Sequence, residues 1–283
     1  MNQHPDSIQD AKVAYLGPQG TYTHLAALQQ FGDECLLVDC ASIDDIFALL
    51  ESRDARYGVV PVENSTEGAI NNTQDCLIDC NVKIIAERIV PIEHNLLVPK
   101  GLSASNITSI AAHKQSLAQC RKWLAANFPA VKQIECASNA EAAILAQGSD
   151  STAAIAGEMA ARLYDLDILR SKIQDQSNNS TRFLVLADEE TSPTGKDKTS
   201  ILVYAENKPG SLFRVLQPFE ELQVSLTKIE TRPSKKEAWE YVFFIDFEGH
   251  VEDENIIVLF DRLRTCTAEI KILGSYPSFQ RNV

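Results

Sequence analysis

The sequence predicts an α/β protein of two domains: a larger one made of two sheets with a cleft between them, and a smaller βαββαβ domain. Three observations support this prediction. From residue 12 to residue 187, short apolar runs alternate with stretches of helical periodicity. Residues 188–197 are polar and contain Pro and Gly, which is typical of a linker. After them a second, shorter set of elements begins, and a chain of 283 residues has room for about two domains.

The first domain is expected to span residues 11–187. Its buried strands are predicted at residues 13–16, 36–38, 57–60, 109–112, 131–136 and 153–156. Helices lie between them, one of which begins with Ser42 and Asp45 in the spacing of a capping box. Residues 83–99 form a long β-rich stretch. This order predicts mostly parallel sheets joined by long crossings.

The second domain is expected to span residues 198–283. Strands are predicted at 199–205, 224–231, 240–247 and 269–276, and helices at 211–222 and 251–266. The order is βαββαβ, which is the ferredoxin-like arrangement.

Composition excludes several classes of function. The net charge of −13 disfavours nucleic acid as a partner, and an anionic ligand would need a local source of positive potential. Of the seven cysteines, Cys76 and Cys80 are one helical turn apart, but no second Cys or His pair completes a set of zinc ligands. The sequence therefore indicates buried free thiols and no metal site. No apolar run approaches the roughly 18 residues of a membrane span, and Met1–Asp10 lacks an apolar signal region. We therefore expect a cytoplasmic protein that does not bind membranes.

Four segments combine Gly, Pro, hydroxyl and amide side chains at points where strands end and helices begin. Ligands in α/β folds bind at such edges. The segments are residues 17–24 (GPQGTYTH), 60–70 (VPVENSTEGAI), 111–117 (AAHKQSL) and 178–183 (NNSTRF).

Each segment also has a purely structural interpretation. The first can be a capped turn, although a helix start there would also bind an anion. The second is harder to explain structurally, because a cap needs one polar side chain and Glu63, Asn64, Ser65 and Thr66 are all present. A lone histidine such as His113 is more often structural. Arg182 is the strongest anion-binding candidate, since its guanidinium matches a carboxylate.

Together the segments predict a small ligand that carries carboxylates. No Rossmann fingerprint, P-loop, nucleophile elbow or zinc motif is present, so no cofactor is expected.

In their order and spacing, four motifs resemble the prephenate dehydratase family over nearly all of residues 12–187. They are Gly17-Pro18-x-Gly20-Thr21, Pro61-x-Glu63-Asn64-Ser65, His113-x-Gln115-Ser116-Leu117 and Thr181-Arg182-Phe183. The C-terminal part resembles an ACT domain, whose phenylalanine-binding segments correspond to Gly210-Ser211-Leu212 and Glu230-Thr231-Arg232-Pro233. Ala112 and Lys114 depart from the family's Ser-His-Pro-Gln pattern, which leaves the role of His113 open.

The resemblance implies a two-lobed catalytic domain like a type 2 periplasmic binding protein, followed by an ACT domain. The implied reaction is the decarboxylating dehydration of prephenate to phenylpyruvate without a cofactor. Feedback by L-phenylalanine and a homodimer or homotetramer are implied as well. Two alternatives stay open: the same chemistry on arogenate, and a non-catalytic amino-acid sensor.

The resemblance also implies the site residues. The catalytic set is Thr181, Arg182, Glu63 and Asn64, and the substrate-binding set is Thr21, Ser65, Gln115 and Phe183. The effector set is Gly210, Ser211, Leu212 and Glu230. We expect Thr181 to act as a positioned proton donor within a hydrogen-bonded network. Arg182 and helix starts at Thr21 and Ser65 would hold carboxylates.

Overall fold

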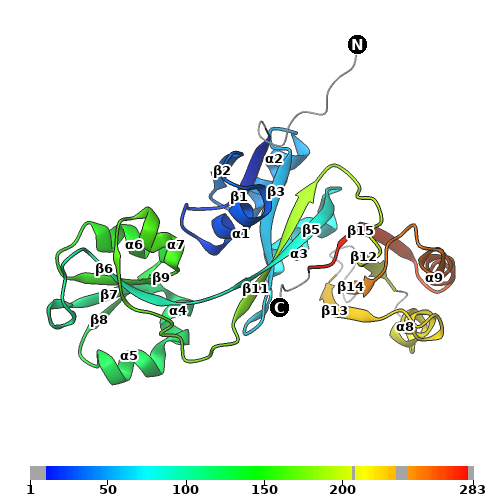
Figure 1. Cartoon of the computed structure of the whole chain (residues 1–283). Helices are drawn as coiled ribbons and strands as arrows, with labels where there is room; N and C mark the ends of the chain where they lie inside the picture. Colours follow the sequence, from blue (N-terminus) through cyan, green and yellow to red (C-terminus); the bar gives the residue numbers. More distant parts are fainter. Residues whose placement is uncertain (1–10, 206–207, 234–240, 280–283) are drawn as a thin grey trace, which may run out of the picture. The chain divides into compact units, whose positions relative to one another are not determined.

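The computed structural model describes residues 11–205, 208–233 and 241–279 (Figure 1). These form two units: residues 11–73 with 88–183, called unit 1, and residues 74–87 with 184–279, called unit 2. The expectation about Met1–Asp10 and the predicted strand start at Glu240 lie outside the described residues.

The first sheet has the strand order β2-β1-β3-β11-β5, and β4 pairs with β3. Its strands are β1 (Lys12–Leu16), β2 (Leu36–Cys40), β3 (Tyr57–Asn64), β4 (Gly68–Ala69), β5 (Lys83–Pro91) and β11 (Ser180–Ala187). β1 pairs in parallel with both β2 and β3, as predicted. Helices α1 (Tyr22–Phe31) and α2 (Ile43–Glu51) contact β1 and β3. α2 begins with the predicted capping box between Ser42 and Asp45.

The second sheet has the order β10-β6-β9-β7-β8. Its strands are β6 (Asn95–Val98), β7 (Ser109–His113), β8 (Lys132–Cys136), β9 (Thr152–Ala156) and β10 (Asp167–Arg170). β7 pairs in parallel with β8 and β9, but β6 pairs antiparallel with β9 and β10. The prediction of mostly parallel sheets is therefore wrong here. β10 was not predicted, because Asp167 and Arg170 interrupt its apolar pattern.

Short helices accompany this sheet. They are η2 (Ala104–Asn106), α4 (Lys114–Gln119), α5 (Arg121–Asn127), α6 (Asn139–Gln147) and α7 (Glu158–Leu163). The first sheet's lobe and the second sheet's lobe are joined by two chain crossings, residues 92–94 and 171–179 (Figure 1). The crossings run side by side, since Ile92 N donates to Asn179 O and Ile173 N donates to His94 O. Unit 1 therefore has the two lobes that the sequence predicts.

A helix start near Ser65 was expected, and the structure corrects it. Helix α3 (Asn71–Asp79) begins six residues later, after a turn and the short strand β4. The turn forms because Asn64 Oδ1 accepts hydrogen bonds from the backbone N–H groups of Thr66 and Glu67. An Asn side chain makes the same kind of bond in a turn and in a helix cap, so the sequence alone does not distinguish them.

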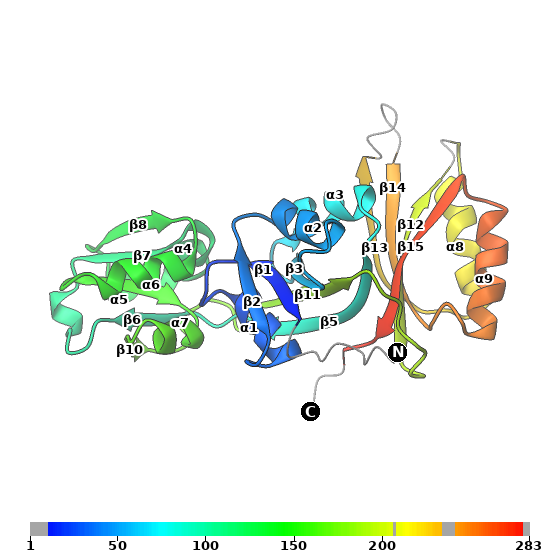
Figure 2. The same ribbon diagram turned by 90° about the horizontal axis from the view of Figure 1, so that it is seen from above.

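Unit 2 contains an antiparallel sheet of order β13-β14-β12-β15. The strands are β12 (Asp197–Tyr204), β13 (Leu226–Pro233), β14 (Tyr241–Glu248) and β15 (Glu269–Pro277). Helices α8 (Ser211–Glu221) and α9 (Glu254–Arg264) lie together beside the sheet (Figure 2). Phe219, Phe247 and Phe260 pack edge to face in the core between them. The predicted βαββαβ order is confirmed.

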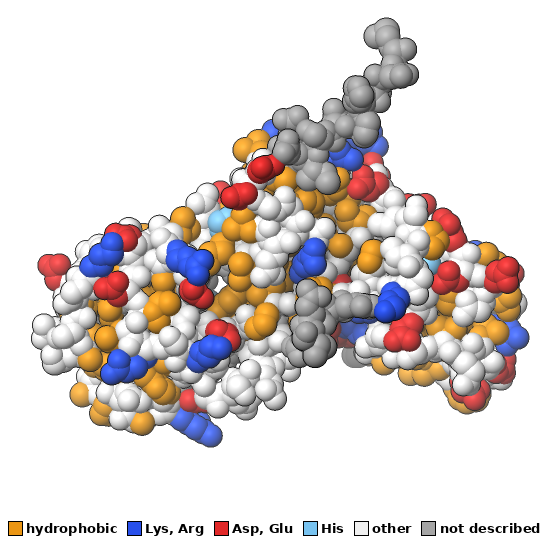
Figure 3. All heavy atoms as spheres, viewed as in Figure 1, with side chains coloured by type: hydrophobic (Ala, Val, Ile, Leu, Met, Phe, Trp, Pro, Cys, Tyr) orange, Lys and Arg blue, Asp and Glu red, His pale blue; other side chains and the backbone are white. Residues whose placement is uncertain are grey.

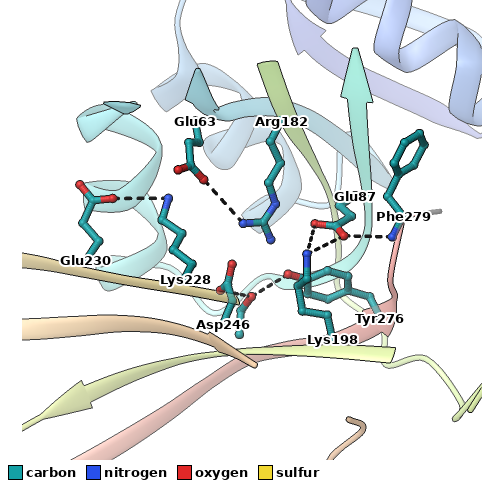
Figure 4. A network of polar contacts seen from close by, with 10 residues as sticks. Glu63, Glu87, Arg182, Lys198, Lys228, Glu230, Asp246, Tyr276 and Phe279 are labelled. Carbon is teal, nitrogen blue, oxygen red and sulfur yellow. Dashed lines mark hydrogen bonds and ion pairs between the residues drawn. The ribbon is translucent and has the colours of Figure 1, made fainter. Parts of the chain in front are cut away.

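Polar contacts join the sheet of unit 2 to residues 74–87 of the same unit. Lys271 Nζ donates to the carbonyls of Leu77, Ile78 and Cys80, at the C-terminal end of α3. The carbonyl end of a helix attracts a cation, so this contact stabilises the end of α3. Lys198 pairs with the buried Glu87 at 2.7 Å (Figure 4).

The surface charges do not form one patch on the face in Figure 3, where Lys and Arg side chains are interspersed with Asp and Glu. Among the described residues, no helix is both long enough and apolar enough to span a membrane.

We predict that Gly274→Ala destabilises unit 2. A Cβ on Gly274 would lie 2.2 Å from the backbone oxygen of Ile84, and backbone cannot move aside as a side chain can. Overpacking of this kind costs about 1–3 kcal/mol. Thermal melting measures the effect, with Gly148→Ala as control because its added Cβ meets no atom closer than 3.9 Å. Equal melting temperatures for the two variants would contradict this account.

Candidate active site

A cavity of about 980 Å³ lies between the two lobes of unit 1. Its wall includes the turn before α1, the turn after β3, the starts of α4 and α6, and the first residues of β11. Asp39, Glu67 and Glu141 line it, whereas no Lys or Arg stands among the described lining residues. Positive potential for an anionic ligand must therefore come from backbone N–H groups and amide side chains.

Four side chains on one side of the cavity form a closed ring of hydrogen bonds, which we call the amide ring. Asn64 Nδ2 donates to Asn179 Oδ1 at 2.8 Å, and Asn179 Nδ2 donates to Gln119 Oε1 at 3.1 Å. Gln119 Nε2 donates to Thr66 Oγ1 at 3.4 Å, and Thr66 Oγ1 donates back to Asn64 Oδ1 at 2.6 Å. Every bond runs in the same direction, so the orientation of each amide is fixed by its neighbours.

Thr181 is attached to this ring. Its Oγ1 accepts a hydrogen bond from Asn64 Nδ2 at 2.9 Å, and the residue is buried and lines the cavity. Because the amide occupies a lone pair of the hydroxyl, the hydroxyl's own hydrogen cannot point to Asn64. It has no acceptor among the described residues, so it remains available for a ligand in the cavity.

Helices α1 and α6, one in each lobe, have their N-cap residues in the cavity wall. At α6, Glu141 accepts a hydrogen bond from Ala137 N, so a carboxylate of the protein already occupies that helix start. At α1, the cap is the neutral side chain of Thr21, and the first turn has no acidic residue. The positive end of α1 is therefore the better place for a ligand carboxylate.

Two tyrosine hydroxyls join parts of unit 1 that are distant in sequence. The hydroxyl of Tyr22 on α1 donates to the backbone oxygen of Glu93, and burial raises the pKa of that phenol. Tyr164 after α7 donates to the backbone oxygen of Gln19 at 2.7 Å. The Tyr164 contact joins the turn at residues 17–20 to the second lobe, and the Tyr22 contact joins α1 to the first crossing.

The structure brings together five of the eight residues predicted for the catalytic and substrate-binding sets. Thr21, Asn64, Gln115, Thr181 and Phe183 all line the cavity. Glu63, Ser65 and Arg182 do not.

Arg182 points away from the cavity because successive side chains of a strand alternate between the two faces of a sheet. Thr181 and Phe183 occupy the cavity face, and the Arg182 guanidinium lies 4.0 Å from the Glu63 carboxylate on the other (Figure 4). Arg182 and Glu63 therefore do not line the cavity, and we place no ligand carboxylate on Arg182.

Ser65 has a structural position instead of a binding one. Its backbone N–H donates to Ser180 O, and its hydroxyl donates to Asn178 O and accepts from Ser180 N. It fastens the end of β3 to the start of β11, and so fixes Asn64 beside Thr181.

Several polar residues of the cavity were not predicted from the sequence, among them His94, Gln119, Asn139 and Asn179. Asn179 was within a segment already noted for its amides, and Gln119 stands one helical turn after Gln115. Asn139 accepts from His113 N and donates to Ser116 Oγ, which orders the start of α4. Among the described residues, no group of three or more His, Cys, Asp or Glu could hold a metal ion.

The residues predicted for the effector site lie at two places in unit 2. Gly210 is the N-cap of α8, and Ser211 and Leu212 form its first turn. Arg214 donates to Pro209 O and to Ser211 Oγ, so a cation lies at this turn. Glu230 on β13 lies 3.4 Å from Lys228 (Figure 4). In the described part of one chain, no hydrogen bond or ion pair joins Glu230 to the α8 turn.

Comparison with known proteins gives consistent matches. The prephenate dehydratase family model matches residues 13–191, and the ACT domain model matches residues 199–257. The bifunctional chorismate mutase/prephenate dehydratase of Pseudomonas aeruginosa is 48% identical over 269 residues, which cover 95% of this chain and 74% of that protein.

Two solved structures have a TM-score of 0.86 to this chain. One is the prephenate dehydratase of Arthrobacter aurescens in complex with L-Phe, 30% identical, with 94% of this chain and 90% of that chain covered. The other is the quorum-quenching acylase GqqA, 26% identical, with 95% and 98% covered.

Two α/β lobes around a polar cleft, followed by a C-terminal ACT domain, define a two-lobed α/β enzyme that carries an ACT domain. Within that class, the chain belongs to the prephenate dehydratase family, which is a family of lyases. The resemblance carried by the four motifs is confirmed.

We predict that Arg182→Lys lowers stability and leaves the Michaelis constant for substrate unchanged, because Arg182 lies outside the cavity. Its side chain is 12% exposed, and a lysine cannot reproduce the planar fork of a guanidinium. The expected loss is about 1 kcal/mol of unfolding free energy. Thermal melts and steady-state kinetics measure the two effects, with the exposed Arg162→Lys as control. A tenfold rise in the Michaelis constant with an unchanged melting temperature would contradict this prediction and indicate that Arg182 contacts the substrate.

Proposed function

We propose that this chain converts prephenate into phenylpyruvate, CO2 and water, with Thr181 as the hydrogen-bond donor to the departing hydroxyl. Two structures with the same TM-score of 0.86 carry different activities in their names, so the fold alone does not decide. The observation that carries the proposal is the Thr181 hydroxyl, which accepts from Asn64 and keeps its own hydrogen for the cavity.

The reaction needs a proton and a fixed geometry. The electron pair of the bond to the ring carboxylate moves into the ring as CO2 leaves. The pair of the C4–O bond departs with the hydroxyl, which takes up one proton and leaves as water. The ring becomes aromatic, so the protein has to supply only a proton donor and an orientation. A threonine hydroxyl is a weak acid, and its contribution is a hydrogen bond that strengthens as negative charge develops on the leaving oxygen.

The absence of Lys and Arg among the described lining residues suits this chemistry. A cation next to the ring carboxylate would stabilise the charged ground state and slow its loss as neutral CO2. The side-chain carboxylate, in contrast, keeps its charge throughout the reaction. We place it at the start of α1, where Thr21 is the cap, with Gln115 and Phe183 as further contacts on the wall.

We predict that Thr181→Ala lowers turnover of prephenate by about 10²-fold or more, the scale for loss of a positioned proton donor. Thr181→Ser should retain part of the rate because it keeps the hydroxyl. The assay follows phenylpyruvate absorbance in alkali, and arogenate serves as a second substrate that differs only in the amino group. Thr108→Ala, at an exposed threonine of the same unit, is the control. Near wild-type turnover by a folded Thr181→Ala would exclude Thr181 as the donor.

The ACT domain is proposed to bind L-phenylalanine and to inhibit the enzyme. The start of α8 supports this, because its cap Gly210 makes no side-chain hydrogen bond and its first turn has no acidic residue. Its backbone N–H groups and Arg214 offer a place for the amino acid's carboxylate. Glu230 lies elsewhere in the same chain, so we assign it to the ammonium only across a subunit interface.

A homodimer or homotetramer would provide that interface. Apolar side chains are exposed near the α8 turn and on the edge strand β13: Leu212, Phe213, Leu226 and Ile229. Pairing between ACT domains would cover them and the open edge. The cytoplasm is the proposed location, supported by seven cysteines, all described, that form no disulfide.

We predict that calorimetry detects phenylalanine binding at millimolar concentration or below, and that phenylalanine raises the melting temperature of unit 2. A ligand that binds only the folded state stabilises it in this way. Arg214→Gln should weaken binding about tenfold, since it removes one charge-assisted contact. Light scattering gives the oligomeric state in parallel. A monomer without binding heat would reduce this domain to a role unrelated to sensing.

A further inference from the structure

His94 is a buried histidine whose two nitrogens have different surroundings. It is 2% exposed and lines the cavity. Its Nε2 lies 2.8 Å from Gln119 Oε1. An amide oxygen can only accept, so Nε2 must carry the hydrogen and donate it. Nδ1 is then an acceptor, and it is buried without a hydrogen-bond partner in the described part of the chain.

The backbone of His94 fixes the position of this ring. His94 stands between β5 and β6, on the crossing between the two lobes. Its N–H donates to Gln174 Oε1 at 3.0 Å, and its carbonyl accepts from Ile173 N at 2.8 Å. Both partners belong to the second crossing. Hydrogen bonds from both its N–H and its carbonyl therefore fix the backbone of His94 and place Nε2 of the imidazole beside Gln119.

The hydrogen on His94 Nε2 matters because the side-chain amide of Gln119 can be turned by 180°. Such a turn exchanges its oxygen and its NH2 group with almost no change in shape. Gln119 Oε1 accepts from both His94 Nε2 and Asn179 Nδ2, which leaves its Nε2 to donate to Thr66. If Gln119 were reversed, its NH2 group would face the NH2 group of Asn179, and Nε2 of His94 could accept only if the hydrogen moved to Nδ1. There it would be a buried donor without a partner in the described part of the chain. His94 thus opposes the reversed orientation of Gln119, in agreement with the direction that the turn after β3 gives to Asn64.

Burial lowers the pKa of His94, which keeps its imidazole neutral near neutral pH. A neutral imidazole supplies the Nε2 donor without placing a cation in the cavity. It therefore meets the requirement derived above, that the ring carboxylate should not be stabilised.

We infer that His94 is a positioning residue: by donating from Nε2 to Gln119 it holds Gln119 and Asn179 in the orientation that supports the hydrogen bond from Asn64 to Thr181. The inference rests on the proposed dehydration. His94 acts through Gln119, Asn179 and Asn64, and not on the reacting atoms.

Two substitutions distinguish the role of Nε2 of His94 from that of Nδ1. In His94→Gln an NH2 group can reach the position of Nε2, whereas the side chain in His94→Asn is too short and retains polar atoms only near Nδ1. We expect His94→Gln to keep kcat within about threefold of the wild type. His94→Asn should lower kcat about tenfold, the scale of one lost hydrogen bond, with KM nearly unchanged. Equal kcat for His94→Asn and the wild type overturns the inference, as does an equal loss in both variants.

A double-mutant cycle tests the route through Gln119. If His94 acts through Gln119, His94→Asn should change kcat little when Gln119→Leu is already present. Additive losses overturn the inference. The control is His250→Gln in unit 2, a histidine that is 1% exposed and far from the cavity in sequence, and kcat should not change.

The wild-type assay separates this inference from the proposed function. If the wild type does not turn over prephenate, the proposed function fails. If it does, the His94 variants decide the inference. Should His94→Asn fail to fold, nitrogen NMR of the wild-type imidazoles reports the tautomer directly. The expected state is hydrogen on Nε2 and none on Nδ1, and the opposite tautomer overturns the inference.

Discussion

The side chain of Asn64 sets the geometry on which the rest of the cavity depends. Its oxygen accepts from Thr66 N, Thr66 Oγ1 and Glu67 N, so that end of the amide is saturated. The NH2 group has two hydrogens, and its two shortest contacts are to Asn179 and Thr181. Each bond contributes only about 1 kcal/mol net, but the NH2 group of the reversed amide would face two backbone N–H donors, those of Thr66 and Glu67. The turn after β3 thus decides that Thr181 is an acceptor toward Asn64 and a donor toward the cavity.

Charge is the second constraint, and it explains why the site is built from amides. The chain carries a net charge of −13, and acidic side chains line the cavity. A dianion can enter only if the protein offers positive potential without a full positive charge next to the carboxylate that leaves. Backbone N–H groups at the start of α1 and amide NH2 groups meet that condition. They also stay fixed in orientation, so no reorganisation is needed when charge moves to the departing hydroxyl.

The sequence predicts the parts of this site that lie in contiguous segments. Asn64 and Thr181 follow from short motifs at the ends of strands, and the α1 start follows from a turn with two glycines. The charge of Arg182 suggests a carboxylate partner, but its place in the strand puts it on the face opposite Thr181. Strand alternation places neighbours of Thr181 on the opposite face, and that signal was present in the sequence. Gln119 and His94 could not be found in this way, since their contacts join residues 25 to 60 positions apart.

The amide ring draws on both lobes, which ties catalytic geometry to their arrangement. Asn64 is the last residue of β3 in the first sheet, and Thr66 lies in the turn that follows. Gln119 ends a helix beside the second sheet, and Asn179 lies on a crossing. The bond between Gln119 and Thr66 is the longest of the four at 3.4 Å, and it connects the lobes directly. A small separation of the lobes would break this bond first and leave Asn64 still donating to Thr181. The ring would then lose its fixed direction before the donor itself is lost, because the hydroxyl and its amide are held by β3 and β11 of one sheet.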